Sequence, residues 1–560
     1  MRTHYPRTPH LPWSPGVSPD DVRTADLSGL AGREVVVTEK LDGENTTLYA
    51  DGLHARSPDS GHHPSRAWVK ALQGRIGHAL PAGWRVCGEN MYARHSLAYE
   101  NLDSWFYGFS VWDADGHCLD WDRTVAFLRG LGIPVPPVLW RGILDGRGER
   151  ALRALNLDLA RQEGYVVRTA DGFGPEDFGR RMAKWVRRGH VRTDTHWMYA
   201  AVVENGRGPA AALWDVRSGG TPGAAALSAA LGLRAGDARD EAVVAEVSAA
   251  LDVLGRTGDD RLAGVLAALL HRSPRPRVGA LLAVSQGMAQ ARKVADLVGL
   301  RARLQRPYPD EERRTGLVRM SYAADLGVLH AVARATAEDA GAREQVDWSA
   351  LHAEGIGGLD GLRETFADLD PDAAARCVAE AREAYALGKI TTADEAVAAT
   401  WRWRSGDFPR LIQTVGPSGS GKSTFARGLP GIDAYISLDD LREARGSRAD
   451  QKANGDVLRD GLDRLDAALA AGGTVVWDAT SLNAHQRSLV HSVARRRDAL
   501  TTHAVALVDE EELVRRNARR THPVPPEVLA SQVRRFSPPY PGQAHRTWYI
   551  GASGTVEEEA

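Results

Sequence analysis

Residues 416–423 read GPSGSGKS, and this stretch constrains the fold of the chain more than any other. It matches the pattern G-x-x-x-x-G-K-[ST] without a mismatch, follows the apolar run RLIQTVG and precedes a helix-like sequence. Its glycines allow backbone N–H groups to close around phosphates, and its lysine reaches the terminal phosphates of a nucleotide. The pattern therefore predicts a strand, a phosphate-binding loop and a helix in direct succession.

The sequence after this loop continues the same architecture. The runs GTVVWDAT and THAVALVD are short, apolar and separated by helix-like stretches, which is typical of a parallel sheet in an α/β domain. We expect Lys422 to contact the β- and γ-phosphates of ATP and Ser423 to bind Mg²⁺ (or Mn²⁺). The nucleotide-binding residues predicted from the motif are Gly416, Ser418, Gly419, Ser420, Gly421, Lys422, Ser423 and Thr424.

Three further segments point to the acceptor of the phosphate. YISLDDLRE follows a second strand, DATSLNAHQR follows the GTVVWD strand, and EEELVRRNARRTHPVPPEVL reads as an arginine-rich helix ending in a proline-rich turn. In this order they resemble the phage-type polynucleotide 5′-kinase family over most of residues 410–535. The resemblance implies that Asp439 is the general base for a 5′-hydroxyl and that Arg442 binds a phosphate of the substrate.

The arginine-rich helix has a role in the same resemblance. It implies that Arg516 and Arg520 hold the phosphate during transfer, which requires little beyond positioning, a proton acceptor and cations. Two alternatives stay open, namely a shift of register to Arg515 or Arg519 and a solvated helix face.

Lysine is rare in this chain, so each lysine is informative. Seven of the 70 basic residues are lysines, and the others are arginines. Lys40 stands in the stretch TEKLDGENTT, between two strand-like runs. Lys-x-Asp-Gly alone is weak evidence, because so short a pattern is common by chance. The sequence strengthens it with companions in a fixed order, which are Arg56, Glu89 in GEN, Phe109 in YGFSVWD, Glu163 in EGYVVR and Lys184 in MAKWVRRGHV.

Together these motifs resemble the covalent nucleotidyltransferases, specifically the RNA ligases, over residues 1 to about 200. The resemblance implies that Lys40 attacks the α-phosphorus of ATP and forms a lysyl–AMP bond. An amine must lose its proton for this step, so we expect the pKa of Lys40 to fall, with Lys184 and a bound Mg²⁺ driving the fall. Asp42 and Gly43 are expected to shape the turn that presents Lys40.

The other motif residues have roles by the same resemblance. Glu89 is expected to bind the ribose, Phe109 to stack on the adenine, Glu163 to hold metal and Lys184 to bind the α-phosphate. A core position for Phe109 and a surface ion pair for Arg56 are the alternatives. The predicted nucleotide-binding set of this region is Glu39, Asp42, Gly43, Arg56, Glu89, Phe109, Glu163 and Lys184.

The last motif departs from the family pattern, which often reads Lys-x-Lys. Here Lys184 is followed by WVR, and Arg187 is the next basic residue. We expect Arg187 to bind RNA phosphates, with a solvated face as the alternative. Net charge is −2 overall, so any nucleic-acid contact must come from such local clusters.

The remaining sequence sets the domain organisation. At 560 residues the chain is too long for one core. Residues 224–400 are rich in alanine, leucine and arginine and show helical periodicity without a catalytic motif. We predict an α+β nucleotidyltransferase domain at 1–205, an all-α domain at 206–405 and an α/β domain at 406–560. Three scattered cysteines, no signal sequence and no membrane-length apolar run favour a cytoplasmic protein that does not bind membranes.

These two resemblances predict a two-step activity on RNA. The chain is expected to phosphorylate 5′-OH ends with ATP and to join them to 3′-OH ends through lysyl–AMP and AppRNA intermediates. Cleaved tRNA is one candidate partner, and the oligomeric state is not predicted. DNA end repair by the same two modules is one alternative. A nucleic-acid sensor or scaffold that binds nucleotide without joining strands is another.

Overall fold

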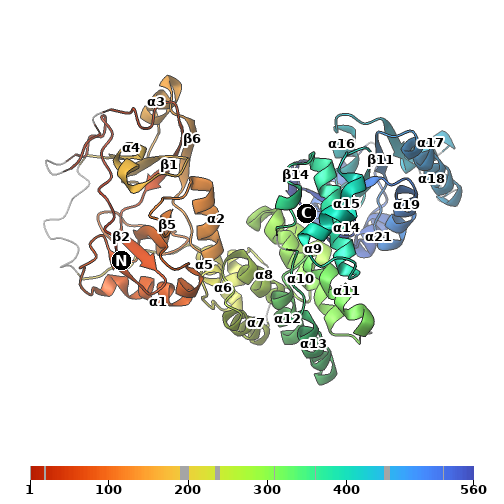
Figure 1. Cartoon of the computed structure of the whole chain (residues 1–560), viewed down its shortest axis with the longest axis horizontal. Coiled ribbons are helices and arrows are strands. Elements are labelled where there is room, and N and C mark those ends of the chain that lie inside the picture. Colours follow the sequence, from red (N-terminus) through yellow and green to blue (C-terminus); the bar gives the residue numbers. More distant parts are fainter. Residues whose placement is uncertain are drawn as a thin grey trace. The chain divides into compact units, whose positions relative to one another are not determined.

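The computed structural model describes residues 2–17, 21–24, 26–188, 201–233, 240–307, 310–359, 361–446, 454–520 and 522–560. The chain divides into two compact units, Met1–Val265 and Leu266–Ala560 (Figure 1). We call them the first and the second unit and describe each by itself. Among the described residues, none of the helices combines the length and apolar character needed to cross a membrane.

The first unit is built on two four-stranded antiparallel sheets. Their strands are rich in β-branched and aromatic residues, and Val35, Val36 and Val37 are fully buried. One sheet has the order β6 (Val138–Ile143), β1 (Glu34–Lys40), β7 (Gly164–Thr169) and β8 (Met182–Val186). The other has the order β3 (Gly52–Ala55), β2 (Glu44–Tyr49), β4 (Arg85–Asn90) and β5 (Phe106–Trp112).

Helices accompany both sheets of the first unit. Helix α2 begins after Asp120, whose carboxylate accepts from the backbone N–H of Arg123, and it ends at Gly132 with a positive φ of 76°. The helical segments are η1 (Pro64–Arg66), α1 (Ala67–Ile76), η2 (Gly77–Ala79), α2 (Trp121–Leu131), α3 (Gly146–Arg153), η3 (Pro175–Asp177), α4 (Phe178–Arg181), α5 (Ala211–Arg217), α6 (Ala224–Ala230), α7 (Glu241–Val253) and α8 (Gly258–Leu269), within which the two units meet in sequence.

Helices α5 and α8 contact the earlier helices α1 and α2 of the first unit. Asp259 accepts from Arg217 Nε at 2.8 Å and also from Arg129 of α2. Arg75 Nε of α1 donates to the carbonyl of Ser218 at 3.0 Å. Residues 206–265 therefore belong to the first unit, whereas 266–405 fall in the second unit. The three-segment division by sequence stays a prediction.

The second unit begins with helices, as the helical periodicity predicted. Pro274 is the N-cap of α9 and Pro276 lies in its first turn, so these two prolines mark the start of the helix. The segments are α9 (Arg275–Gln286), α10 (Met288–Leu304), α11 (Asp310–Ser321), α12 (Leu326–Ala335), α13 (Ala340–Ala353), η5 (Glu364–Phe366), α14 (Pro371–Ala386), α15 (Ala393–Thr400) and η6 (Trp401–Trp403).

A six-stranded sheet follows, and its first five strands in spatial order run parallel, in agreement with the predicted α/β domain. The order is β10 (Ala434–Ser437), β11 (Thr474–Asp478), β9 (Arg410–Val415), β12 (Leu500–Ala506), β13 (Arg546–Ile550) and the antiparallel β14 (Val556–Glu559). Its helices are α16 (Lys422–Arg427), α17 (Leu438–Ala444), α18 (Asn454–Ala470), α19 (Ala484–Arg496), α20 (Glu510–Ala518) and α21 (Pro526–Arg535).

The sheet shares its core with the preceding helices. Ile412 packs with Ala426 of α16 on one face, whereas Leu411 packs with residues of α18 and α19 on the other. Towards β12 and β13, the apolar contacts come from α10, where Met288 clusters with Val505 and Tyr549. The helices before residue 405 therefore cover part of the sheet that residues 406–560 would otherwise leave open.

Two candidate nucleotide sites

The first candidate site lies between the two sheets of the first unit. Thr38, Val166 and Lys184 stand in one row across β1, β7 and β8, and Lys40 lies two residues beyond Thr38 on the same face. This face and the second sheet enclose a cavity of about 580 Å³. Lys40 lines it together with six residues of the predicted nucleotide-binding set, namely Glu39, Gly43, Arg56, Glu89, Phe109 and Lys184.

Lys40 is held by a carboxylate. Its Nζ donates to Glu163 Oε2 from the end of β1, next to the start of β7. Burial opposes the charge on Lys40, but Glu163, Glu89 and Asp42 outweigh it and raise the pKa of the amine. The protein by itself thus holds Lys40 as an ammonium ion, which is opposite to the expected fall. Removal of this proton must therefore depend on what binds in the cavity.

Two neighbours of Lys40 have shifted pKa values. Burial raises the pKa of Glu89 to about 8, and the negative charges of Glu163 and Asp42 add to the rise while Lys40 opposes it. Burial lowers the pKa of Lys184, and the positive charge of Lys40 lowers it further. Lys184 Nζ also lies 3.8 Å from the carboxylate of Asp21. The site thus combines two lysines with several carboxylates inside one cavity.

The turn after Lys40 is fixed by Asp42. Its Oδ2 accepts from the backbone N–H of Ser96 at 2.9 Å and of Leu97 at 2.8 Å, and from the Ser96 hydroxyl at 2.6 Å. A Cβ on Gly43 would lie 2.6 Å from the carbonyl oxygen of Asn90, so a side chain is excluded there. Asp42 points to a loop rather than into the cavity, and it sets the turn as the sequence suggested.

Phe109 reaches the cavity because of a β-bulge. Cys87 pairs with Ser110 and Gly88 with Gly108, so Phe109 is the extra residue of β5. Its ring stands edge-on to Tyr5 at 5.5 Å between centroids, and its carbonyl accepts from Arg168 Nη1 at 3.1 Å. The bulge turns a half-buried aromatic ring towards the site.

Sequence reasoning missed several residues of this cavity. Arg168 is buried on β7 and lines the cavity, as does Tyr5 from the N-terminal segment. Glu44 forms a buried ion pair with Arg66, whose Nε lies 2.7 Å from Glu44 Oε2. The alternation of β7 carried a signal for Arg168, because it stands two residues after Val166 on the cavity face. Nothing in the sequence places Tyr5 there.

The two predicted arginines differ in their placement, because only Arg56 lines the cavity. Arg187 is buried, and its Nη1 donates to the carbonyl of Leu159 at 2.7 Å. Arg56 lines the cavity, and its guanidinium donates to the carbonyl of Pro6 at 3.5 Å. The segment after Arg188 that would extend the basic cluster lies outside the described residues.

The second candidate site is formed by the loop between β9 and α16. Gly416, Gly419 and Gly421 have φ values of 153°, 83° and 88°, which only glycine adopts readily. Lys422 at the start of α16 is buried with 8% exposure. Burial lowers its pKa, which the carboxylates of Asp478 and Asp439 oppose and the charge of Arg520 reinforces. The loop thus holds one lysine in a polar cradle.

Ser423 is hydrogen-bonded to an acidic residue, Asp478, that no sequence motif marks. Its hydroxyl donates to Asp478 Oδ1 at 3.1 Å, and Thr414 donates to the same oxygen at 3.2 Å. The Tyr435 hydroxyl donates to Asp478 Oδ2 at 2.7 Å. Asp478 is the last residue of β11, which pairs with β9, so the end of the GTVVWD strand carried the signal.

The cavity beside this loop measures about 820 Å³. Arg516 and Arg520 line it and Arg515 does not, although both Arg515 and Arg516 form ion pairs with Glu512. Arg516 Nη2 donates to the carbonyl of Ala552 at 3.0 Å. The lining residues are Gly419, Gly421, Lys422, Ser423, Thr424, Phe425, Gly428, Leu429, Arg516, Arg520 and residues 552–556.

Four other predicted residues, Asp439, Arg442, Ser418 and Ser420, do not line this cavity. Asp439 on α17 is 61% exposed and pairs with Arg442 Nη1 at 2.6 Å. Ser418 and Ser420 are buried within the loop, and the Ser418 N–H donates to Gln532 Oε1 at 2.8 Å. Asp439 is thus exposed and Arg442 half-buried, and the charge of Asp439 acts on Lys422.

Comparison with known families supports both assignments at the level of class. The family model described as RNA ligase matches residues 33–186, and the one described as AAA domain matches residues 411–539. The N-terminal region is thus similar to RNA ligases and the C-terminal region to a nucleotide-binding P-loop domain, as the motifs predicted. The match over residues 411–539 supports the P-loop class, and the 5′-kinase activity stays a prediction. No curated protein matches the chain significantly.

Solved structures give only distant similarity. A chain of the Pnkp1/Rnl/Hen1 RNA repair complex is 25% identical with a TM-score of 0.21, over 23% of this chain and 44% of that one. A Naegleria gruberi RNA ligase solved with ATP and Mn is 20% identical with a TM-score of 0.22, over 29% and 51%. Chaetomium thermophilum Kti12 with ADP-AlF3 is 19% identical with a TM-score of 0.22, over 25% and 89%. This chain thus spans about half the length of the first and the second of these.

Proposed function

We propose that this chain repairs RNA breaks in two ATP-dependent steps. The second unit phosphorylates a 5′-OH end, and the first unit joins that end to a 3′-OH. The observation that carries the proposal is that each unit has its own cavity with a buried or half-buried lysine, and that the two lysines have different surroundings. Lys40 faces carboxylates in one cavity, and Lys422 begins a helix after a glycine loop in the other.

In the first unit, Lys40 Nζ is the nucleophile. When nucleotide and cation bind, it releases its proton to solvent and attacks the α-phosphorus of ATP as pyrophosphate leaves. Lys184 binds the α-phosphate, Glu89 the ribose and Phe109 the adenine. The lysyl–AMP then passes AMP to an RNA 5′-phosphate, and the 3′-OH attacks this AppRNA end while AMP leaves.

In the second unit, phosphoryl transfer needs positioned charges rather than a covalent intermediate. Asp439 accepts the proton of the RNA 5′-OH, whose oxygen attacks the γ-phosphorus as ADP leaves. Lys422, Arg516 and Arg520 stabilise the negative charge on the transferred group. Arg442 binds a neighbouring phosphate of the RNA strand.

A divalent cation fits the second site. Ser423 and Asp478 present two oxygens 3.1 Å apart, which suits a Mg²⁺ or Mn²⁺ ion that takes its other ligands from phosphates and water. In the described residues, no cluster of three or more His, Cys, Asp or Glu residues forms a cage of its own. When bound, the ion would offset phosphate charge in both sites, with Glu163 as the ligand proposed in the first.

A nicked tRNA anticodon stem-loop with 5′-OH and 3′-OH ends tests the proposal. With ATP and Mg²⁺, we expect a 5′-phosphorylated species first and the sealed strand later. Sealing of the matching DNA but not the RNA would support DNA repair instead. A protein that binds nucleotide but yields neither phosphorylated nor sealed product would overturn the proposal and favour a sensor or scaffold.

A further inference from the structure

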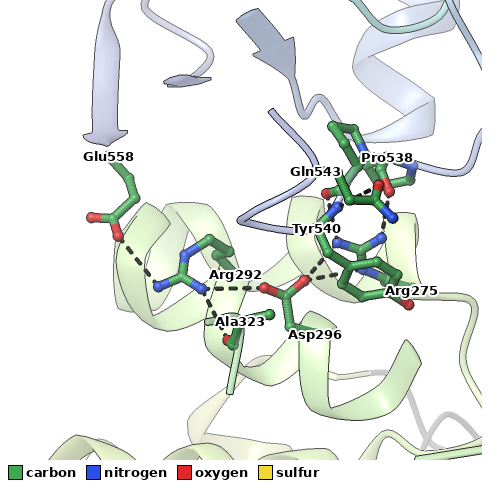
Figure 2. Close-up of polar contacts among 9 residues, drawn as sticks. Arg275, Arg292, Asp296, Ala323, Pro538, Tyr540, Gln543 and Glu558 are labelled. Atoms are coloured by element: carbon green, nitrogen blue, oxygen red, sulfur yellow. Dashed lines mark hydrogen bonds and ion pairs between the residues drawn. The ribbon is translucent and has the colours of Figure 1, made fainter. Parts of the chain in front are cut away.

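Asp296 on α10 lies at the centre of a buried ionic network in the second unit (Figure 2). It is 1% exposed. Its Oδ1 accepts from Arg275 Nη2 at 2.6 Å, and its Oδ2 accepts from Arg292 Nη1 at 3.2 Å. A buried charge persists only when its partners satisfy it. Both arginines also contact residues of the sheet region that follows α9–α15, which we call the helical segment. Arg275 contacts Pro539, and Arg292 contacts Glu558.

Arg275 holds the segment that precedes β13. Its guanidinium donates to the carbonyls of Pro538 and Pro539, the latter at 2.9 Å, and lies 3.5 Å from the centroid of the Tyr540 ring. Helix α21, which ends just before this segment, carries Gln532, and Gln532 accepts from the phosphate-binding loop at Ser418. This direction leads to the back of the nucleotide loop.

Arg292 holds the last strand of the sheet. Its Nη2 lies 3.5 Å from Glu558 Oε1 on β14, and its Nη1 donates to the carbonyl of Ala323 at 3.2 Å (Figure 2). The loop between β13 and β14 contributes residues 552–555 to the cavity wall, and Val556, the first residue of β14, also lines it. Within that loop, the Ala552 carbonyl accepts from Arg516. This direction leads to an arginine that faces Lys422.

We infer that Asp296 and Arg292, in the helical segment, are positioning residues for phosphoryl transfer in the second unit. The inference rests on the proposed 5′-kinase function. Neither residue lines the nucleotide cavity. They act by fixing the β13–β14 loop, whose Ala552 carbonyl accepts from Arg516 and so orients the Arg516 guanidinium. Phosphoryl transfer is sensitive to such placement because its catalysis is mostly positioning and charge stabilisation. The helices before residue 405 are thus part of the kinase machinery.

The most direct test weakens the contact between Arg292 and Glu558. Glu558→Gln removes the charge that meets Arg292, and Arg292→Lys keeps the charge but loses the fork. We expect each to lower kcat/KM for ATP in 5′-OH phosphorylation by about 3- to 10-fold, with KM for RNA unchanged. Asp296→Asn should have the same sign and a larger effect. Sealing of RNA that already carries a 5′-phosphate should be unaffected.

A double-mutant cycle separates positioning from general destabilisation. In an Arg516→Ala background, Glu558→Gln should have no further effect, because the residue it orients is gone. Glu383→Gln is the matched control, since it breaks a surface pair with Arg319 in the same helical segment. Wild-type kcat/KM for Glu558→Gln and Arg292→Lys in folded protein, or full additivity with Arg516→Ala, would overturn the inference.

A measurement of nucleotide binding distinguishes failure of this inference from failure of the proposed 5′-kinase function. The affinity for a fluorescent ADP analogue is measured, and the P-loop component is the part lost in Lys422→Ala. If the wild-type protein binds ADP there but phosphorylates no RNA, the 5′-kinase proposal fails. The inference is then judged on whether Glu558→Gln weakens that component, and an unchanged affinity contradicts it.

Discussion

Lys40 and Glu163 form an ion pair across adjacent strands, where Lys40 at the end of β1 lies opposite Gly164 at the start of β7. The pair raises the pKa of the amine that must act as the nucleophile. Without nucleotide the amine is therefore held protonated. The phosphates of a bound nucleotide have to compete with these carboxylates for Lys40 Nζ. This relationship makes the identity of residue 40 the first thing to test.

Lys40→Arg should abolish transfer of label from α-³²P-ATP to the protein. Arginine keeps the positive charge and can still pair with Glu163, but a guanidinium remains protonated at neutral pH and is not a nucleophile. Lys70→Arg, at an exposed residue of α1, is the matched control and should label like the wild type. Persistent label in folded Lys40→Arg protein would remove Lys40 from the proposed mechanism.

The register of the arginines on α20 gives a second prediction. Arg516→Ala should lower kcat for 5′-OH phosphorylation by roughly 10²- to 10³-fold, because it removes a cation that faces the transferred group. Arg515→Ala, one residue earlier and paired with Glu512, should stay within about twofold of wild type, as is usual for an exposed ion pair. The reverse order of effects would show that the helix presents the other register to the substrate.

The sequence singled out the lysines of both sites more readily than their surroundings. Lys40, Lys184 and Lys422 stand out because lysine is rare, and they lie at the end of β1, in the middle of β8 and at the start of α16. Phe109 is different, since a bulge decides where its ring points and no local sequence signal marks it. Asp478 ends its strand, but the sequence alone does not mark it as a site residue, because its place beside Ser423 depends on the pairing of β11 with β9.

The helical region shows a second limit of sequence reasoning. Its periodicity predicted helices correctly, but periodicity does not say which sheet a helix covers. Met288 of α10 packs on Val505 and Tyr549, and Arg292 of the same helix reaches Glu558. These contacts join residues more than 200 positions apart, so they arise from tertiary packing alone.

A histidine pair in the second unit predicts acid sensitivity. His491 and His503 lie with Nε2 atoms 2.8 Å apart. Burial, followed by nearby positive charge, lowers the pKa of His491 to about 4 and that of His503 well below its usual value. Both are neutral when folded and take up protons more readily when unfolded, so stability should fall as the pH drops from 6.5 towards 4.

Thermal unfolding between pH 7.5 and pH 4.5 measures this effect. His503→Gln should flatten the pH dependence of Tm for the second unit, whatever it does to stability at neutral pH. His485→Gln, at an exposed position of α19, is the control and should keep the wild-type slope. An unchanged slope in His503→Gln would assign the acid sensitivity to other groups.

The two sites should work independently, because one attacks the α-phosphorus of ATP and the other transfers the γ-phosphate. Asp439→Ala should fail on 5′-OH RNA yet seal RNA supplied with a 5′-phosphate, since it removes only the proposed base. Lys40→Ala should do the reverse and accumulate phosphorylated, unsealed strands. Mixing the two variants should restore joining, because the phosphorylated RNA can diffuse between them. Loss of sealing on pre-phosphorylated RNA by folded Asp439→Ala protein would mean that the sites are coupled and that the two-step scheme is wrong.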